Sequence, residues 1–317
     1  MIRNTALLTG STGFIGANLA RHLIKNSYKV HILTRPESSN WRIKDILPHL
    51  VDHRVNFQNK KELQGVMAEI KPNIIFHLAS YGGYPFQQNL QNMVEANIVE
   101  TVNLLESLKT IDYQVFINAG SSSEYGYKTE PMKESDALSP NSFYAATKAS
   151  ATYISQVYSR MYQKPIVTVR PFSVYGPYEE PTKFIPTLIT RSLKGEDIHL
   201  TQGIEKRDFI YIDDFIDGLL AICHSPDKVK GKVINLGSGK QYSVKEAADL
   251  IASLTGSKSK LHFGTYKPRN WDTNYWVADI SLAKRLLGWQ PANSFEEGLK
   301  KTIAWFEKNI NLYEKKN

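Results

Sequence analysis

A glycine-rich turn near the start of the chain, Gly10-Ser-Thr-Gly-Phe-Ile-Gly16, constrains the fold more than any other stretch. An apolar, strand-like segment (Thr5–Thr9) precedes it, and an amphipathic helix to about Asn26 is expected to follow. In such a loop the first glycine permits a tight turn, the second lets the backbone approach a pyrophosphate, and the third lets helix and strand pack closely. The helix N-terminus then faces the anion. This order of elements predicts a dinucleotide-binding βαβ unit.

Apolar runs of strand length recur along the chain and alternate with helical patterns. The predicted strands after the first are Lys29–Thr34, Arg54–Phe57, Asn73–Ser80, Gln114–Ala119, Ile166–Arg170 and Val233–Leu236. The predicted helices include Leu90–Lys109, one opened by Pro140 and Asn141, Phe184–Lys194, Tyr242–Leu254, Ser281–Leu287 and Ser294–Asn309. This alternation predicts an α/β fold, a doubly wound parallel Rossmann sheet with a smaller, mostly C-terminal α/β substrate domain.

The size and composition exclude several classes of protein. The chain has 317 residues, enough for a sizeable core, and no apolar run reaches the roughly 20 residues of a membrane span. The N-terminus shows no signal-peptide pattern and Cys223 is the single cysteine, so we expect a cytoplasmic protein without a disulfide framework. The net charge of +8 lies on scattered lysines, so we expect an anionic small molecule and no nucleic acid as partner. The sequence contains no metal-ligand cluster.

A second motif joins the serine run Ser121–Ser123 to a tyrosine and a lysine on one helix. The serines follow the apolar run Gln114–Ala119, which places them at the carboxyl end of a buried strand, where open α/β sheets bind ligands. Tyr144 and Lys148 are four residues apart and so share a helix face. The ammonium is expected to lower the phenol pKa from its usual value of about 10. Such a phenol suits general acid/base work on a hydroxyl or carbonyl oxygen, which a serine hydroxyl can also hold.

The end of the second predicted strand bears on the choice of cofactor. A carboxylate there would bind the adenosine ribose and disfavour a 2′-phosphate, but the chain has Thr34-Arg35, then Ser38 and Arg42. Because arginines and hydroxyls suit a 2′-phosphate, we expect NADP, with NAD as the less favoured alternative. Asn56 and Phe57, at the end of the third predicted strand, are expected to meet the adenine.

Other polar residues are interpreted as structural or as part of the substrate cavity. His77 lies within an apolar strand and is expected to be a hydrogen-bonded core histidine rather than a catalytic one. Asp213 and Asp214 stand at a helix start and are interpreted as N-caps. Cys223 lies among apolar helix residues, which indicates an inert core thiol. Tyr81, in a loop at the ligand edge, is expected to line the substrate cavity.

With these motifs in place, the chain resembles the extended short-chain dehydrogenase/reductases that act on nucleotide sugars, the NAD(P)-dependent epimerase, dehydratase and reductase family. The resemblance spans nearly the whole chain and is carried by Thr9-Gly-Ser-Thr-Gly-Phe-Ile-Gly16, His77-Leu-Ala79, Ser121-Ser-Ser-Glu-Tyr-Gly126, Tyr144-Ala-Ala-Thr-Lys148, Arg170-Pro-Phe-Ser-Val-Tyr-Gly-Pro177, Arg207-Asp-Phe-Ile-Tyr-Ile-Asp-Asp214 and Leu287-Gly-Trp-Gln-Pro291. It implies a nucleotide-diphosphate sugar as substrate and a homodimer through the helices near 90–110 and 141–163. We expect residues 1–172 and 207–236 to form the dinucleotide-binding domain, and 173–206 and 237–317 the nucleotide-sugar-binding domain.

The resemblance also implies roles for individual residues. It makes Ser121, Tyr144 and Lys148 catalytic, and Lys148 also holds the nicotinamide ribose. The residues expected at the cofactor are Gly10, Thr12, Gly13, Phe14, Ile15, Gly16, Arg35, Ser38, Arg42, Asn56, Phe57, Leu78, Ala79, Ser80, Asn97, Tyr144, Lys148, Pro171 and Ser173. The residues expected at the substrate are Tyr81, Ser122, Ser123, Ser173, Arg207 and Arg269, the two arginines at its diphosphate.

Departures from the family pattern bear on the reaction. The 4,6-dehydratases carry a glutamate two residues before Tyr125-Gly126, where this chain has Ser123. Glu124 lies one residue later, and at a strand end one residue turns a side chain to the other face, which disfavours a dehydratase. Epimerases usually carry an acidic residue in place of Arg35, which disfavours an epimerase. Ser173 stands where many relatives have an asparagine that contacts the sugar diphosphate, so the substrate geometry stays open.

These features favour one function and leave others open. We expect an NADPH-dependent reductase of a nucleotide-linked 4-keto-6-deoxyhexose, acting in deoxysugar biosynthesis by hydride transfer to C4. Tyr144 would protonate the alkoxide and Ser121 would stabilise its oxygen. The alternative is a nucleotide-sugar 4-epimerase or 4,6-dehydratase with retained NAD(P). A redox-sensing protein that binds NADP without chemistry is a hypothesis of another class, against which the complete Ser/Tyr/Lys set argues.

Overall fold

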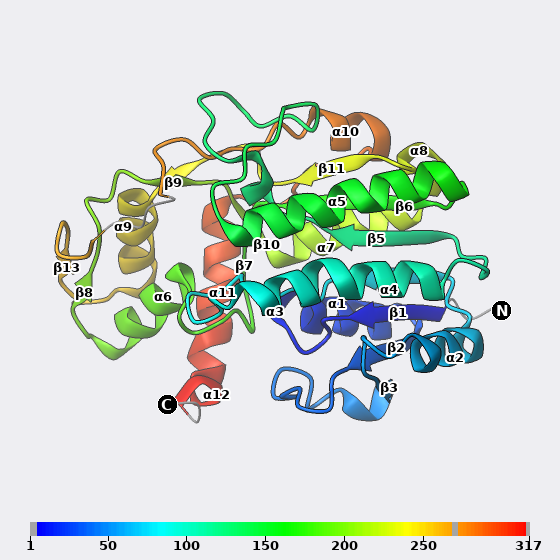
Figure 1. The fold of residues 1–317 in the computed structure, drawn as a ribbon. Helices are drawn as coiled ribbons and strands as arrows, with labels where there is room; N and C mark the ends of the chain where they lie inside the picture. Colours follow the sequence, from blue (N-terminus) through cyan, green and yellow to red (C-terminus); the bar gives the residue numbers. More distant parts are fainter. Residues whose placement is uncertain (1–4, 268–271, 315–317) are drawn as a thin grey trace.

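A parallel seven-stranded sheet forms the centre of the protein in the computed structural model, which describes residues 5–267 and 272–314 (Figure 1). Its strands are β1 (Thr5–Thr9), β2 (Lys29–Thr34), β3 (Leu50–Arg54), β4 (Ile74–His77), β5 (Val115–Ala119), β6 (Ile166–Pro171) and β11 (Val233–Leu236). They lie in the order β11-β6-β5-β4-β1-β2-β3, and every neighbouring pair is parallel. The chain order reverses between β1 and β4, so the ligand crevice of this sheet is expected at their carboxyl ends.

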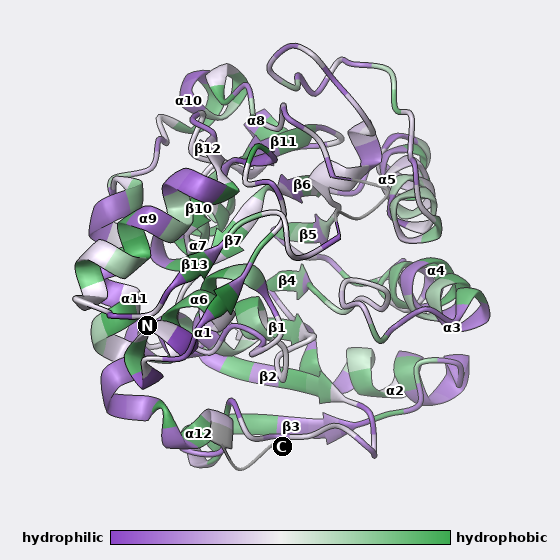
Figure 2. Cartoon of the chain, turned by 90° about the vertical axis from the view of Figure 1, so that its left-hand side faces the viewer, coloured by the Kyte–Doolittle hydropathy of each residue, from purple (hydrophilic) through white to green (hydrophobic). Residues whose placement is uncertain are grey.

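Helices cover both faces of the sheet, as the doubly wound prediction requires. Figure 2 shows the layers edge-on, with one helix group on each side of the strands. The helices on one face are α1 (Phe14–Lys25) and α7 (Ile212–Cys223), and those on the other are α2 (Lys60–Ile70), α4 (Glu100–Ser107) and α5 (Phe143–Tyr162). Among the described residues, no helix combines the length and the apolar character needed to cross a membrane.

Smaller elements follow β6 and complete the chain. Figure 1 shows that α6, α9 and α11 lie beyond the edge toward which the sheet strands run. The short strands form three pairs, which are β7 (Ser173–Tyr175) with β10 (Phe209–Tyr211), β9 (Lys206–Arg207) with β12 (Tyr242–Ser243), and β8 (Ile198–His199) with β13 (Leu261–His262). The remaining helices are η1 (Leu47–His49), α3 (Leu90–Val94), η2 (Glu95–Val99), η3 (Ser122–Tyr125), α6 (Phe184–Lys194), α8 (Pro226–Val229), α9 (Val244–Thr255), α10 (Ser281–Leu287), α11 (Phe295–Asn309) and α12 (Asn311–Glu314).

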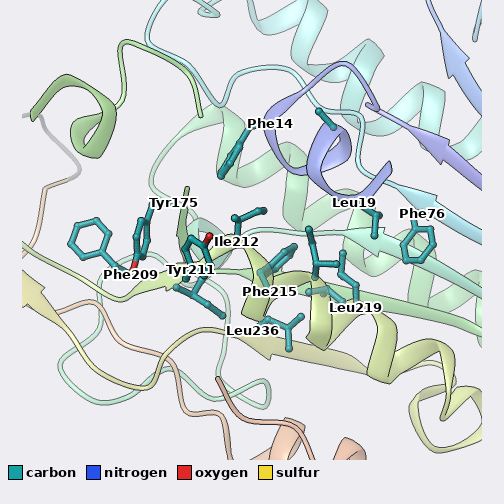
Figure 3. Packing of buried hydrophobic residues seen from close by; sticks show 14 of the residues in the cluster. Phe14, Leu19, Phe76, Tyr175, Phe209, Tyr211, Ile212, Phe215, Leu219 and Leu236 are labelled. Carbon is teal, nitrogen blue, oxygen red and sulfur yellow. The ribbon is translucent and has the colours of Figure 1, made fainter. Parts of the chain in front are cut away.

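The largest apolar cluster joins the sheet to the helices α1, α7 and α11. Figure 3 shows Phe215 and Leu219 of α7 beside Leu236 of β11, and all three side chains are buried. Tyr175 and Tyr211, from the paired strands β7 and β10, belong to the same cluster and have ring centroids 5.8 Å apart. One continuous core therefore ties the central sheet to the segments that follow it.

The third strand differs from the sequence prediction of Arg54–Phe57. β3 runs from Leu50 to Arg54 and pairs only with β2 within the described sheet. It is an edge strand whose residues are mostly exposed, so it lacks the apolar pattern that marked the other strands. The apolar residues Val55 and Phe57, which suggested a strand, instead enter the core at the turn that follows it.

The predicted helix Leu90–Lys109 is one continuous helical segment, but it is not regular. α3 passes into a π-helical stretch at Glu95–Val99 before α4 begins at Glu100. A π-helical stretch widens the backbone by one residue per turn and occurs frequently at functional sites. Sequence periodicity does not reveal it, because the apolar pattern changes little across a single wide turn.

The helices α9 and α7 begin in different ways. Ser243 caps α9, since its hydroxyl accepts a hydrogen bond from the Glu246 N–H and the Glu246 carboxylate returns one to the Ser243 N–H. The interpretation of Asp213 and Asp214 as N-caps is wrong: Tyr211 occupies that position at α7, without a side-chain cap. The Asp214 carboxylate instead accepts hydrogen bonds from the loop before α11, including the Ala292 N–H at 2.9 Å.

Candidate active site

The glycine turn has the close packing that its three glycines predict. Gly10 has a φ of +70°, and a Cβ on it would lie 2.7 Å from the backbone nitrogen of Ala79 on the neighbouring loop. A Cβ on Gly16 would overlap the carbonyl of Gly10. The Gly13 N–H donates to that same carbonyl at 3.0 Å. Side chains are thus excluded at Gly10 and Gly16, which brings backbone N–H groups close to the crevice between β1 and β4.

The residues of this turn fit the pyrophosphate of a dinucleotide. α1 begins after Gly13 without a side-chain cap, so the N–H groups of its first turn are available to an anion. The Ser11 hydroxyl is buried and has no hydrogen-bond partner among the residues that the structure describes. Buried hydroxyls normally have a partner, so a donor left in a glycine cradle fits a phosphate oxygen. Thr12, Phe14 and Ile15 belong to the same turn, and Phe14 and Ile15 pack on the core from α1.

His77 is a core histidine, as predicted. Its Nδ1 lies 2.8 Å from the Thr9 hydroxyl and its Nε2 lies 2.9 Å from the Thr101 hydroxyl, so it joins β1, β4 and α4. Burial lowers the pKa of His77 to about 3, helped by the Lys148 ammonium. The Thr9 hydroxyl also accepts from the Ala79 N–H at 3.2 Å. This neutral imidazole therefore holds the backbone of Leu78 and Ala79 against the glycine turn.

Asn97, predicted at the cofactor, has an amide that holds a loop through hydrogen bonds to protein groups. It lies in the π-helical stretch and is buried. Its Oδ1 accepts from the Tyr81 N–H at 2.9 Å, and its Nδ2 donates to the Tyr81 carbonyl and to the Thr147 hydroxyl. Both amide donors and the acceptor are thus used by protein groups. Asn97 sets the position of Ser80 and Tyr81 relative to α5.

The structure brings Ser121 and Tyr144 into direct contact. Ser121 follows β5 and is buried, and its hydroxyl hydrogen-bonds the Tyr144 phenol and accepts from the Ser123 N–H at 3.1 Å. Tyr144 lies in the first turn of α5, where Ser142 caps the helix and fixes its start. Lys148 lies one turn later on the same helix and is buried. Ser121 and Tyr144 therefore meet at the carboxyl end of β5, with Lys148 one turn away from Tyr144 on α5.

The pKa values of this group differ from the expectation. Burial raises the pKa of Tyr144 to about 12, and the hydrogen bond with Ser121 offsets only part of that effect. Burial also lowers the pKa of Lys148 to about 8, against the opposing effect of the Glu124 carboxylate. The expectation that Lys148 keeps the Tyr144 pKa low is wrong for this structure, because burial is the largest effect on the Tyr144 phenol and raises its pKa.

Glu124 is buried and its carboxylate is used by protein groups, but it lies in the 3₁₀ helix η3 and not at the strand end that the one-residue offset assumed. It lies in η3 with a fully buried side chain. Oε1 accepts from the Ser121 N–H at 2.8 Å and from the Thr152 hydroxyl at 3.0 Å, while Oε2 pairs with the Arg170 Nε at 2.9 Å. Arg170 also lies over the ring of Tyr125. The carboxylate fixes the serine turn against β6 and is fully occupied there.

Arg35, predicted to bind a 2′-phosphate, pairs with a carboxylate instead. Its Nη2 donates to both oxygens of Glu100, each at 2.8 Å, and the Glu100 side chain is only 7% exposed. The Ser38 hydroxyl accepts from the Arg35 N–H at 3.2 Å, which closes the turn after β2. Sequence reasoning missed Glu100. The available signal was a charged residue between Asn97 and Thr101 in an otherwise buried part of a helix.

Arg42 is also held by protein groups. Its guanidinium donates to the Tyr178 carbonyl and to Glu180, each at 2.8 Å, and to the Thr12 carbonyl at 3.4 Å. Its side chain is buried at 7% exposure. Arg42 thus braces the glycine turn against the loop that follows β7, and the prediction that it binds a 2′-phosphate is corrected.

The residues predicted at the adenine have different surroundings. Phe57 is buried in a cluster with Leu63 and Met67 of α2, and its carbonyl accepts from the Asn103 amide at 3.0 Å. Asn56 is exposed, and its Oδ1 accepts from the Gln58 N–H at 2.9 Å. The prediction that the Phe57 ring packs on the adenine is therefore corrected, because that ring fills the core beneath the loop.

Most of the residues predicted to bind the substrate lie in the segments that follow β5, β6 and β8. Ser122 is buried and Ser123 half-buried in η3, while Ser173 is half-buried beside Phe209 of β10. Pro171, predicted at the cofactor, is half-buried at the end of β6, beside Leu236 of β11. The Arg207 guanidinium donates to Asp272 at 2.8 Å and lies over the ring of Trp276. Arg269 lies outside the described residues.

Sequence reasoning also missed the link between two loops at this edge. Lys183 donates to the Gly83 carbonyl at 2.6 Å and lies over the ring of Tyr84. The charge of a Tyr84 phenolate would be close enough to raise the pKa of Tyr144. Glu179 is buried nearby, and burial raises its pKa to about 8 against the effect of Lys183. Lys183 and Gly83 are 100 positions apart in the chain, so no local sequence pattern indicates this contact.

A doubly wound parallel sheet, a glycine turn at its switch point and a Ser/Tyr/Lys group at the strand ends together define an extended short-chain dehydrogenase/reductase. Residues 6–237 match the model of a family described as the NAD dependent epimerase/dehydratase family. The chain belongs to this family of nucleotide-sugar enzymes.

Relatives of known name agree over nearly the full length. A UDP-glucuronate 4-epimerase of Thermodesulfobacterium geofontis is 32% identical over 320 residues, which cover 96% of this chain and 97% of that protein. The UDP-glucuronic acid 4-epimerase of Bacillus cereus, solved with UDP-glucuronic acid and NAD, has a TM-score of 0.86 and 29% identity over 96% of this chain and 99% of its own. The dTDP-glucose 4,6-dehydratase of Bacillus anthracis, solved with NAD, has a TM-score of 0.85 and 28% identity over 97% of both chains.

Proposed function

We propose that this protein is an NAD-dependent nucleotide-sugar 4-epimerase, and not the NADPH-dependent reductase that the sequence predicts. The observation that carries this proposal is the use of the Glu124 carboxylate by Arg170, Thr152 and the Ser121 backbone. Elimination of water requires a further acid or base beside the Ser/Tyr/Lys group, and Glu124 is the carboxylate nearest to it in sequence. Reversal of the configuration at C4 requires only one acid/base group, which Tyr144 provides.

The cofactor proposal is NAD. The Arg35 guanidinium, which would mark a 2′-phosphate site, is neutralised by Glu100, and the Arg42 donors go to protein acceptors. The related epimerase and dehydratase structures were both solved with NAD. Ser11 and the first turn of α1 would hold the pyrophosphate.

The residues of the chain would bind the oxygen of the sugar 4-hydroxyl and transfer its proton. Bound NAD would supply the two-electron chemistry at C4. Tyr144 would act as the phenolate: it would accept the proton of the sugar 4-hydroxyl as hydride leaves C4, and return it to the C4 oxygen after the ring turns over, which restores the phenolate, while the Ser121 hydroxyl holds the same oxygen. With a pKa lowered only to about 8, Lys148 stays charged near neutral pH, and its ammonium would favour this phenolate when cofactor and substrate are bound.

We propose a UDP-sugar as substrate, with UDP-glucuronate as the first candidate, because a UDP-glucuronate 4-epimerase is 32% identical over nearly the whole chain. Ser122, Ser123, Ser173 and Tyr81 would contact the sugar or its diphosphate. The segments 173–206 and 237–317 would form the nucleotide-sugar-binding domain, and 1–172 and 207–236 the dinucleotide-binding domain. Arg207 would face the diphosphate from β9.

We propose a homodimer through the helices near 90–110 and 141–163. Supporting this, the exposed apolar side chains of α5 include Tyr153, Val157 and Met161, with Met161 70% exposed. Leu90 and Val99, on the neighbouring helical segment, are exposed as well. An apolar surface of this kind is typical of a subunit interface. Light scattering after gel filtration would test it, with a monomeric mass as the contrary result.

The function is tested by product analysis. The purified protein is incubated separately with UDP-glucuronate, UDP-glucose and dTDP-glucose without added cofactor, and the products are separated by anion exchange and identified by proton NMR. We expect the C4 epimer of a UDP-sugar, with no net change in the absorbance of reduced nicotinamide. A 4-keto-6-deoxy product would establish a dehydratase instead. Consumption of added NADPH with a nucleotide-linked 4-ketosugar, and no epimer from any substrate, would restore the reductase.

A further inference from the structure

The Arg35–Glu100 ion pair stands where a dinucleotide fold recognises the adenosine ribose. Arg35 directly follows β2, and the end of that strand faces the ribose 2′ position in this fold class. Glu100 reaches the pair from the start of α4, 65 residues later in the chain. The Arg35 side chain is 37% exposed and the Glu100 side chain 7% exposed. The arginine therefore lies between the crevice and a buried carboxylate.

The surroundings of Arg35 make a second anion unfavourable there. Glu95 and Glu37 both lie near enough for their charges to raise the pKa of Glu100, in addition to the larger effect of burial. The Thr34 hydroxyl donates to Asp52 at 2.6 Å, and the Ser38 hydroxyl accepts from the Arg35 N–H. The Thr34 hydroxyl, which could otherwise donate to a phosphate, is thus tied to Asp52, and several carboxylates surround Arg35.

A neutral 2′-hydroxyl and a 2′-phosphate differ sharply beside such a pair. A phosphate of charge near −2 needs a cation that is free to form charge-assisted hydrogen bonds. Arg35 could provide them only by sharing its guanidinium with Glu100, which would place the phosphate next to a buried carboxylate. A hydroxyl carries no charge and leaves the pair undisturbed.

We propose that Glu100 is the residue that sets cofactor choice in this protein: by neutralising Arg35 it excludes the 2′-phosphate, so that the site takes NAD although the strand end carries an arginine. Glu100 acts through Arg35 and is a selectivity residue rather than a catalytic one. The inference rests on the proposed function only in that the protein binds a dinucleotide. It concerns the choice between NAD and NADP, which a measurement of turnover alone does not reveal.

The test is a competition for binding. Purified protein is incubated with equimolar NAD and NADP, free nucleotide is removed by gel filtration, and the bound nucleotide is released by acid and quantified by mass spectrometry. We expect wild-type protein to hold mainly NAD. In Glu100→Gln the NADP-to-NAD ratio should rise about tenfold or more, because one freed arginine gains a charge-assisted hydrogen bond to the phosphate.

Two further variants assign the effect to the pair. Combining Glu100→Gln with Arg35→Gln should return the ratio to within about threefold of wild type, since the freed cation is then absent. Glu106→Gln, on the same helix and paired with Lys109 at the surface, is the matched control and should leave the ratio unchanged. Glu100→Ala provides a second route to the freed arginine if the glutamine variant does not fold, as judged by circular dichroism.

The contrary results are distinct. A folded Glu100 variant with an unchanged ratio, or wild-type protein that holds mainly NADP, overturns this inference while C4 epimerisation can still be observed. If the NADP-to-NAD ratio is also raised in the double variant, which lacks Arg35, the inference is overturned as well. Failure of every variant and of wild-type protein to bind either nucleotide overturns the inference together with the proposed function.

Discussion

The Glu124 carboxylate and the Arg170 guanidinium form an ion pair at 2.9 Å inside the protein, with side chains 0% and 3% exposed. The pair joins the serine turn after β5 to the neighbouring strand β6. Glu124 also accepts from the Ser121 N–H, so the position of Ser121, the proposed catalytic serine, depends on it. Glu124 is close to the Ser/Tyr/Lys group in sequence, but its contacts are those of a structural residue.

Removal of this carboxylate should be strongly destabilising. Glu124→Gln leaves the Arg170 charge buried without its partner, which costs about 3–5 kcal/mol of unfolding free energy. Urea denaturation followed by circular dichroism measures the loss. Glu130→Gln, an exposed residue in the following loop, is the control and should change stability by less than about 0.5 kcal/mol. A loss below about 1 kcal/mol for Glu124→Gln would show that the pair is not maintained in solution.

Tyr144→Phe should abolish most of the activity without unfolding the protein. Loss of the phenol removes the acid/base group, so kcat for C4 epimerisation should fall by roughly 10²–10⁴-fold with little change in KM. Tyr153→Phe, two turns further on α5 with a side chain 55% exposed, is the matched control and should retain wild-type rates. The assay is the NMR time course of the epimer. A Tyr144→Phe protein with wild-type kcat would remove the proposed mechanism.

His77 should make the protein sensitive to acid. Burial lowers its folded pKa to about 3 from an ordinary value of 6.5, so below 6.5 only the unfolded chain binds this proton. The stability that His77 contributes is therefore complete above pH 6.5 and is lost as pH falls toward 3. Between pH 7 and pH 5 the loss should be about 2 kcal/mol.

The comparison with His77→Gln isolates this contribution. The variant should be less stable than wild type at pH 7, but it should lose about 2 kcal/mol less on going to pH 5, measured by urea denaturation at both values. His224→Gln removes an exposed imidazole and should keep the wild-type pH dependence. Equal losses in wild type and His77→Gln would mean that the buried imidazole does not titrate as described.

Two glycine-to-alanine changes should have opposite effects. In Gly16→Ala the new Cβ overlaps the Gly10 carbonyl, so the turn must shift, which costs about 1–3 kcal/mol and lowers the amount of NAD retained on gel filtration. In Gly65→Ala, within α2, nothing lies within 4 Å of the new Cβ. This change should stabilise the protein by up to about 1 kcal/mol through helix propensity. Equal effects at both positions would contradict the close approach of helix and turn.

Several features of this protein could be predicted from its sequence, because they depend on residues close together in the chain. The glycine turn with its flanking strand and helix, the central strands β1, β2 and β11, and the Ser243 cap of α9 all follow from local pattern and steric requirement. The buried parallel strands are apolar throughout, so their runs were visible. The family and the Ser/Tyr/Lys motif were recognisable for the same reason.

Other features were decided only by the tertiary structure, because they depend on which groups meet after folding. The pairing of Arg35 with Glu100 and of Glu124 with Arg170 joins residues 65 and 46 positions apart, and no local pattern specifies either partner. The Tyr144 pKa likewise depends on how completely the fold excludes water, and burial is the largest effect on it. An arginine or a tyrosine in a sequence motif thus indicates which reactions or ligands are chemically possible. The groups that surround the side chain after folding, and its exposure to water, determine which of these it supports.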